Sequence, residues 1–139
     1  MFVYDSIASL RVVEDMKIKV IGTDVNPEAQ GKFLVDEFEI LPAPEDNERK
    51  YIDSLLGICK QHSVDAIILT SDSESRAVSN HRNLFVNKKI AVSVSSPDIV
   101  ATMTDKLTLL KKLENSGIDV GSYVAVESIE SAKSALKQL

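Results

Sequence analysis

The sequence predicts an α/β protein of three layers, in which a mainly parallel sheet is covered by helices on both faces. Short apolar runs of strand length alternate along the chain with segments whose apolar residues recur at helical spacing. One run, at residues 66–69 (Ala-Ile-Ile-Leu), is apolar at every position, as expected of a strand buried on both faces. These two observations favour strands joined by helical crossovers.

The first predicted elements are a helix over residues 6–15 and a strand over residues 17–23. In the helix, Ile7, Leu10 and Val13 recur at helical spacing with charged residues between them. The strand alternates lysine with apolar residues, then becomes apolar, and turn-forming residues follow it.

A second short strand is predicted over residues 37–41, where prolines stop it. The helix that follows runs from about residue 45 to 61 and begins with acidic residues, which the helix dipole favours in a first turn. Cys59 lies on the apolar face of this helix, so we expect it in the core. The strand at residues 66–69 comes next.

Ser71 and Glu74 have the spacing of a capping box and predict a helix to about Phe85. A strand is predicted over residues 90–94. The Ser-Pro pair that follows places a proline just inside another helix, its preferred position. No internal repeat or low-complexity segment interrupts this order.

Thr104 can cap a further helix, which Gly117 ends. Residues 120–126 are expected to be extended, and Ser128 caps a last helix. The sequence divides accordingly into an α/β domain over residues 1–117 and the start of a following region over residues 118–139.

Composition excludes several classes of protein. The 139 residues are 44% hydrophobic and 27% charged, which is typical of a folded domain. The formal net charge is −5, so we expect no nucleic-acid partner. The sequence has no apolar run near the roughly 20 residues of a membrane span and no signal-peptide pattern, so we expect no membrane contact and a cytoplasmic setting. The single cysteine excludes an intrachain disulfide.

Familiar catalytic motifs are absent from the sequence, including the glycine-rich nucleotide loops, the HExxH zinc motif and CxxC pairs. His62 and His81 fall near predicted helix ends, where surface or capping roles are commonest. The sequence therefore designates no catalytic residue and no metal ligand.

The carboxyl ends of the strands are where an open α/β sheet binds its ligands. Asp24 follows a predicted strand and could bond a substrate hydroxyl, although an Asx-turn with Asn26 explains it better. Asp72 and Glu74 lie in the first turn of a predicted helix, where dipole stabilisation alone is sufficient reason for acids. These three residues are the candidates for a substrate cleft.

Lys106 is unusual because it follows Thr104 and Asp105 at a predicted helix start, where a cation opposes the helix dipole. An anion bound between the ammonium and the free N–H groups would remove this conflict. The alternative is a solvated lysine paired with Asp105, which on these residues alone is the better explanation.

Five segments together resemble a known family: 21–27 (Ile-Gly-Thr-Asp-Val-Asn-Pro), 65–74 (Asp-Ala-Ile-Ile-Leu-Thr-Ser-Asp-Ser-Glu), 95–97 (Ser-Ser-Pro), 104–107 (Thr-Asp-Lys-Leu) and 116–118 (Ser-Gly-Ile). Their order is similar to that of the N-terminal, pre-ATP-grasp region of ATP-grasp ligases such as the carbamoyl-phosphate synthase large subunit. The resemblance covers the chain from about Ser6 and implies a Rossmann-like sheet of the pre-ATP-grasp type.

The resemblance also implies an activity. Enzymes of this family use ATP and Mg²⁺ to convert a small-molecule carboxylate into an acyl phosphate, which an amine or ammonia then attacks. By the same resemblance Lys106 would contact nucleotide phosphates, and Asp24, Asp72 and Glu74 would face the substrate. The family's nucleotide-clamping lysines and acidic metal ligands would follow Leu139, so we expect this chain to be inactive alone. The alternatives are a regulatory module and a structural domain for subunit contacts.

The family's first strand and its glycine-rich turn would precede Ser6. That strand is normally central, so its absence predicts a gap between the strands at residues 17–23 and 66–69. A remnant strand at residues 2–4, direct pairing of the two neighbours, or a second chain could each fill the gap. Three residues are too few to cover such an edge, so we expect a homodimer or larger assembly.

Overall fold

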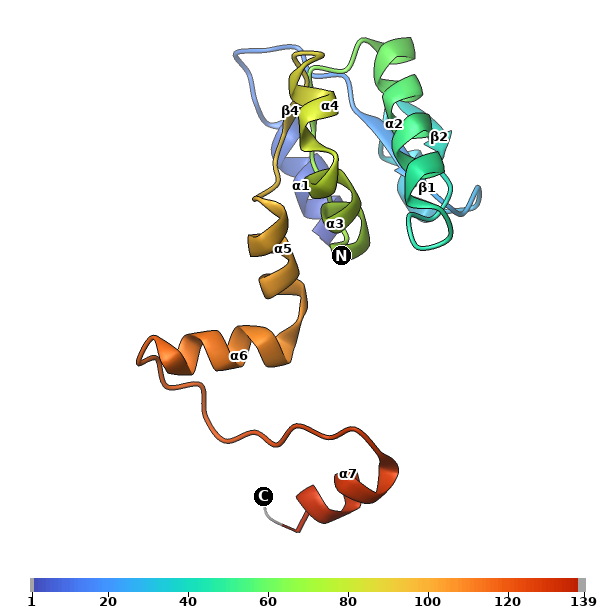
Figure 1. Cartoon of the computed structure of the whole chain (residues 1–139). Helices are drawn as coiled ribbons and strands as arrows, with labels where there is room; N and C mark the ends of the chain where they lie inside the picture. The colour runs from blue at the N-terminus through green and yellow to red at the C-terminus, as the bar shows by residue number, and fades with distance from the viewer. Residues whose placement is uncertain (1, 138–139) are drawn as a thin grey trace. The chain divides into compact units, whose positions relative to one another are not determined.

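The strands lie in two separate parallel pairs in the computed structural model (Figure 1). β1 (Ile21–Asp24) pairs with β2 (Glu37–Ile40), and β3 (Ala66–Ile67) pairs with β4 (Ala91–Val92). The mixed α/β class and the parallel direction of pairing are confirmed. The described strands form these two pairs, and the single three-layer sheet stays a prediction.

The structure describes residues 2–137, and the chain divides into two units, Met1–Pro97 and Asp98–Leu139. Both strand pairs belong to the first unit. The domain boundary predicted after residue 117 stays a prediction. The helices of the first unit are α1 (Phe2–Arg11), the 3₁₀ helix η1 (Gln30–Phe33), α2 (Glu48–His62), α3 (Asp72–Asn80) and α4 (Arg82–Val86).

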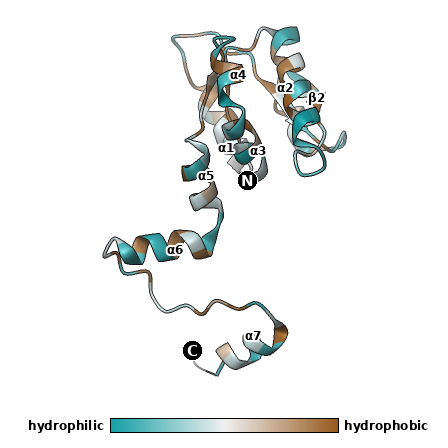
Figure 2. Cartoon of the chain, in the orientation of Figure 1, coloured by the Kyte–Doolittle hydropathy of each residue, from teal (hydrophilic) through white to brown (hydrophobic). Residues whose placement is uncertain are grey.

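Helix α2 supplies much of the core of the first unit. Asn47 caps its start by accepting from the N–H of Lys50, and Ser63 ends it in a left-handed conformation. One face of α2 is apolar and the other polar (Figure 2). The buried apolar cluster combines this face with α3, α4 and the strand ends; its members are Leu41, Tyr51, Ile52, Leu55, Cys59, Ala77, Val78, Phe85 and Ile90.

The helix predicted from Ser71 to Phe85 is two helices. Ser71 does cap α3, because its hydroxyl accepts from the N–H of Glu74. The backbone leaves helical geometry at His81 (φ −113°, ψ 15°), and α4 begins at the next residue. This break lets Phe85 enter the core, where its side chain is fully buried.

The start of the chain differs from the predicted helix over residues 6–15 and from the possible strand at residues 2–4. Residues 2–4 belong to α1, so they do not form the remnant strand considered above, and the helix ends at Arg11 rather than at residue 15. Strand β1 begins only at Ile21. Its pairing starts where the N–H groups of Asp36 and Glu37 donate to the carbonyl of Val20.

The second unit contains α5 (Pro97–Thr104), which starts at its border, α6 (Lys106–Asn115) and α7 (Ile129–Ala135). Asp105 rather than Thr104 caps α6, since the Thr104 hydroxyl donates back to Val100. Ser128 caps α7 as predicted. Across residues 2–137, no helix combines the length and the apolar character needed to cross a membrane.

Candidate functional site

The loops after β2 and β3 meet beside the first turn of α3. Tyr51 of α2 reaches Glu74 of α3, and the Ser73 hydroxyl bonds Glu45 in the loop after β2. We call Glu45, Tyr51, Ser71, Ser73 and Glu74 the strand-end cluster. Because parallel strands carry their ligand sites at their carboxyl ends, this cluster lies where the sequence predicted a cleft.

Glu74 is held by a hydroxyl at each carboxylate oxygen. The Tyr51 hydroxyl donates to Oε1 over 3.4 Å, and the Ser71 hydroxyl lies 2.9 Å from Oε2. Ser71 also accepts from the N–H of Glu74 at 3.2 Å. These contacts fix the direction of a half-buried carboxylate.

Tyr51 is 2% exposed, and its burial raises the pKa of its hydroxyl, as does the charge of Glu74 beside it. Tyr51 therefore remains a proton donor throughout the neutral range. The Ser73 hydroxyl lowers the pKa of Glu45, which keeps that carboxyl charged. The strand-end cluster thus offers acceptor oxygens held by neutral hydroxyls.

The two aspartates predicted for the cleft have different surroundings. Asp24 ends β1 and accepts from the N–H of Asn26 at 2.8 Å, so the Asx-turn expected as its structural role is present. Asp72 is exposed in the first turn of α3, which it shares with Glu74. The structure therefore brings Asp72 and Glu74 together on one helix turn.

Lys106 is the first residue of α6, in the second unit, and is exposed. Asp105 accepts from the N–H of Thr108 at 2.7 Å, and this bond lowers the pKa of its carboxyl. Asp105 thus acts as the helix cap, and the pairing with Lys106 considered from the sequence is not among its hydrogen bonds in the described chain. Lys106 keeps the position at a helix N-terminus that suggested an anion site.

A hollow of about 420 Å³ adjoins the segment after β4. One of its walls is fixed by the buried hydroxyl of Ser79, which donates to the carbonyl of Ser95 at 2.8 Å. Its lining consists of Ser79, Asn80, Arg82, Asn83, Val94, Ser96 and Pro97. The carboxyl end of β4 is one of the strand ends at which the sequence predicts ligand binding.

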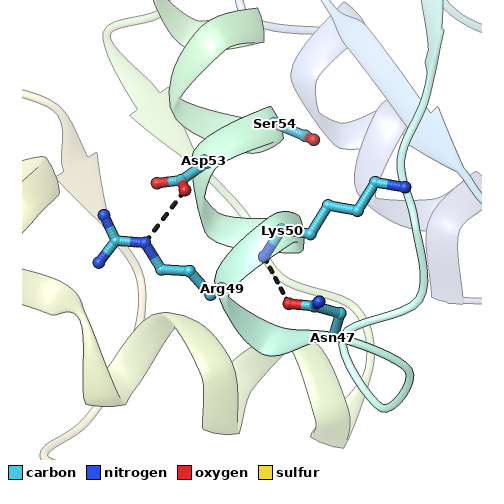
Figure 3. Close-up of a pocket in the computed structure, with 5 residues that line it drawn as sticks. All are labelled: Asn47, Arg49, Lys50, Asp53 and Ser54. Atoms are coloured by element: carbon cyan, nitrogen blue, oxygen red, sulfur yellow. Dashed lines mark hydrogen bonds and ion pairs between the residues drawn. The ribbon is translucent and has the colours of Figure 1, made fainter.

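Another hollow, of about 660 Å³, lies along the polar face of α2 (Figure 3). Its residues come from one helix and its cap: Asn47, Arg49, Lys50, Asp53 and Ser54. Arg49 is paired with Asp53 at 3.0 Å, while the Lys50 side chain extends away from that pair (Figure 3). The feature is the surface of a single helix and contains none of the predicted site residues.

Two contacts were missed by the sequence reasoning. Tyr51 was not singled out, although a buried tyrosine usually finds a partner for its hydroxyl. His62 was expected at the surface or as a cap, but its side chain is only 5% exposed and lies between Glu37 and Glu39. Alternating glutamates on a strand were the available signal, because residues two apart share one face.

Within residues 2–137, no three His, Cys, Asp or Glu residues come together in an arrangement that could hold a metal ion. Cys59 lies in the core as expected, and burial raises the pKa of its thiol to about 11. The thiol is therefore poorly suited to act as a nucleophile or ligand.

The chain matches one family of known proteins over most of the first unit. The model of the family described as PylC-like, N-terminal domain, matches residues 7–93, which include both strand pairs and the strand-end cluster. None of the curated proteins matches the chain. The chain belongs to the PylC-like N-terminal domain family, which is part of the pre-ATP-grasp and ATP-grasp ligase group.

Proposed function

We propose that this chain is the N-terminal domain of an ATP-dependent ligase that joins a carboxylate to an amine or ammonia, similar to the carbamoyl-phosphate synthase large subunit. The family match over residues 7–93 supports the ligase group. In the assembled enzyme the two parallel strand pairs belong to one Rossmann-like sheet with helices on both faces, which gives three layers. The enzyme works in the cytoplasm on a small-molecule carboxylate.

Glu74 carries this proposal. Its carboxylate is oriented by Tyr51 and Ser71 at the carboxyl end of β3, where α/β sheets bind ligands. A carboxylate with fixed oxygens can accept hydrogen bonds from substrate hydroxyl or amino groups. Asp72 in the same helix turn and Asp24 at the end of β1 are proposed to face the same substrate.

The nucleotide side of the proposal rests on Lys106. An exposed ammonium at the start of the ten-residue helix α6 is suited to the negative charge of a phosphate. In the ligase group that the chain resembles, the acidic ligands of Mg²⁺ belong to the ATP-grasp fold, and among residues 2–137 no three His, Cys, Asp or Glu residues come together. We therefore propose that another part of the ligase holds the metal and that this chain alone does not turn over ATP.

The test is substrate-dependent ADP release by the ligase that contains this domain, using a panel of carboxylates paired with ammonia and simple amines. Trapping with hydroxylamine detects an acyl phosphate intermediate. Glu74→Gln should raise the KM for the carboxylate and leave the KM for ATP unchanged, whereas the exposed Glu14→Gln should change neither. An unaltered carboxylate KM in Glu74→Gln would remove Glu74 from the substrate site. Absence of ADP release with every pair would contradict the ligase and favour the regulatory or subunit-contact alternative.

A further inference from the structure

We propose that His62, together with Glu37 and Glu39, forms a pH-sensitive latch that fastens the end of α2 to strand β2. Nδ1 of His62 lies 3.0 Å from Oε2 of Glu37, and Nε2 lies 2.7 Å from Oε1 of Glu39. The imidazole therefore meets one carboxylate on each side. The latch is separate from the strand-end cluster, because Glu37 begins β2 whereas that cluster follows the strand ends.

The geometry fixes the protonation state that the latch needs. Glu37 and Glu39 are two residues apart and project from the same face of β2, so the ring can bridge them. A carboxylate oxygen only accepts hydrogen bonds, so both ring nitrogens must donate. Only the doubly protonated, positively charged imidazole has two N–H groups.

The surrounding groups balance that charge. Lys19, from the segment before β1, pairs with Glu37, and Gln61 donates to Oε1 of Glu39 at 3.0 Å. With the ring charged, two cations face two anions. Farther along the same edge, Arg11 and Asp36 form their own pair at 2.9 Å and do not alter this balance.

Loss of one ring proton reverses the interaction. A neutral ring would leave a nitrogen lone pair against a carboxylate oxygen, with one negative charge in excess and the side chain 5% exposed. Gln61 Nε2 lies 3.1 Å from Nε2 of His62, so it could donate to that nitrogen but could not remove the repulsion from Glu39. Removal of one ring proton should therefore open the latch.

His81 supplies an internal comparison. Only its Nε2 is engaged, at 3.0 Å from Oε1 of Glu48, and its side chain is 29% exposed. A neutral ring with its proton on Nε2 makes that contact equally well. His62 therefore needs the charged ring, whereas His81 does not.

The sign of the effect follows from proton linkage. The bridging contacts need both ring protons and the open state does not, so the latch forms at low pH and is lost as pH rises. Release of one proton changes the opening equilibrium constant by at most about tenfold per pH unit. The amides of β2 and of the last turn of α2 should report this opening.

Two measurements on the whole chain test the latch. Long-range ¹H–¹⁵N NMR spectra of the wild type should show two protonated nitrogens on His62 at about pH 6 and loss of one of them as pH rises. Hydrogen exchange of β2 amides, corrected for intrinsic chemistry, should accelerate with pH in the wild type and in His81→Gln. The pH dependence should be absent in His62→Gln.

The proposal is overturned if His62 carries a single proton at pH 6 in the folded chain, as in a neutral ring that accepts from Gln61. It is equally overturned if His62→Gln retains the wild-type pH dependence of exchange. The NMR titration uses the wild type alone, so it decides the matter even if His62→Gln does not fold.

Discussion

The hydroxyl of Tyr51 lies 3.4 Å from Oε1 of Glu74 and joins helix α2 to the first turn of α3. Tyr51 is buried in the core cluster, so its ring position is set by packing and its hydroxyl emerges at the strand ends. The aromatic ring thus connects the stability of the first unit to the orientation of a candidate substrate-binding carboxylate.

Tyr51→Phe should keep the ring packing and remove only this hydrogen bond. We expect a loss of about 1 kcal/mol in the free energy of unfolding, the usual net value for one hydrogen bond. Urea denaturation measures it, with the exposed Tyr4→Phe as the matched control. If the two variants were equally stable, the Tyr51–Glu74 bond would contribute nothing.

Replacement by alanine should change the free energy of unfolding in opposite directions at two glycines, Gly22 and Gly57. A Cβ at Gly22 in β1 would lie 2.9 Å from Cγ1 of Val35, so Gly22→Ala should destabilise the chain by about 1–3 kcal/mol. A Cβ at Gly57, inside α2, would have open space around it, with no neighbouring side chain within 4 Å. Gly57→Ala should therefore stabilise the chain by about 0.5–1 kcal/mol. Urea denaturation midpoints of both variants check the signs, and destabilisation by Gly57→Ala would contradict this view of α2.

Acid should weaken the edge of the β1–β2 pair through Asp36. The Val20 N–H, which donates to Asp36 at 2.7 Å, and the Arg11 guanidinium lower the pKa of this carboxyl. A lowered pKa in the folded state gives stability above the ordinary aspartate range, and this stability is lost as pH falls below about 4. Between pH 6 and pH 3, the urea midpoint of Asp36→Asn should therefore fall less than that of the wild type. An equal fall in both would exclude Asp36 as a source of the acid destabilisation.

Self-association remains a prediction, and the structure gives it a location. The residues of β3 and β4 that pack on the core, Ile67 and Val92, alternate with exposed Ala66 and Ala91, and Ile68 beyond β3 is 54% exposed. Parallel sheets are normally covered on both faces, so we expect this exposed face to bind a second copy of the chain.

Sedimentation equilibrium should therefore show a dimer or larger species that Ile68→Lys converts to monomer. Val25→Lys is the control, since Val25 is similarly exposed (57%) but lies in the loop after β1. A wild-type monomer at the highest concentration reached would reject the homodimer.

The sequence predicted those features that depend on local chemistry. Caps such as Ser71 and Ser128, the Asx-turn at Asp24 and the core position of Cys59 follow from short-range hydrogen bonding and helical spacing, and the structure has them. The order of the elements through α6 follows from the same patterns, apart from the division of the helix predicted over residues 71–85. Residues 120–126, which were expected to be extended, belong to no strand in the described chain. Parallel pairing was also predictable, since helical segments separate successive strands.

Long-range contacts were not predictable in the same way. Nothing local places Tyr51 against Glu74, or His62 between Glu37 and Glu39, because these residues are 23 or more positions apart and meet only after α2 packs. The separation into two sheets is also a property of strand pairing across the chain. Two of the expectations for the first strand are not met, since residues 2–4 form a helix and β1 does not pair with β3 in the described chain.

The KM for ATP of the ligase that contains this domain tests the central claim most directly, measured for the wild type, Lys106→Ala and Lys112→Ala. Lys106 begins α6 and Lys112 lies in its last turn, so the control removes an equal charge from the other end of the same helix. We predict that Lys106→Ala raises the KM for ATP about tenfold, the loss expected for one charged hydrogen bond, and that Lys112→Ala leaves it unchanged. An ATP KM that is the same in all three proteins would contradict the assignment of Lys106 to the nucleotide site.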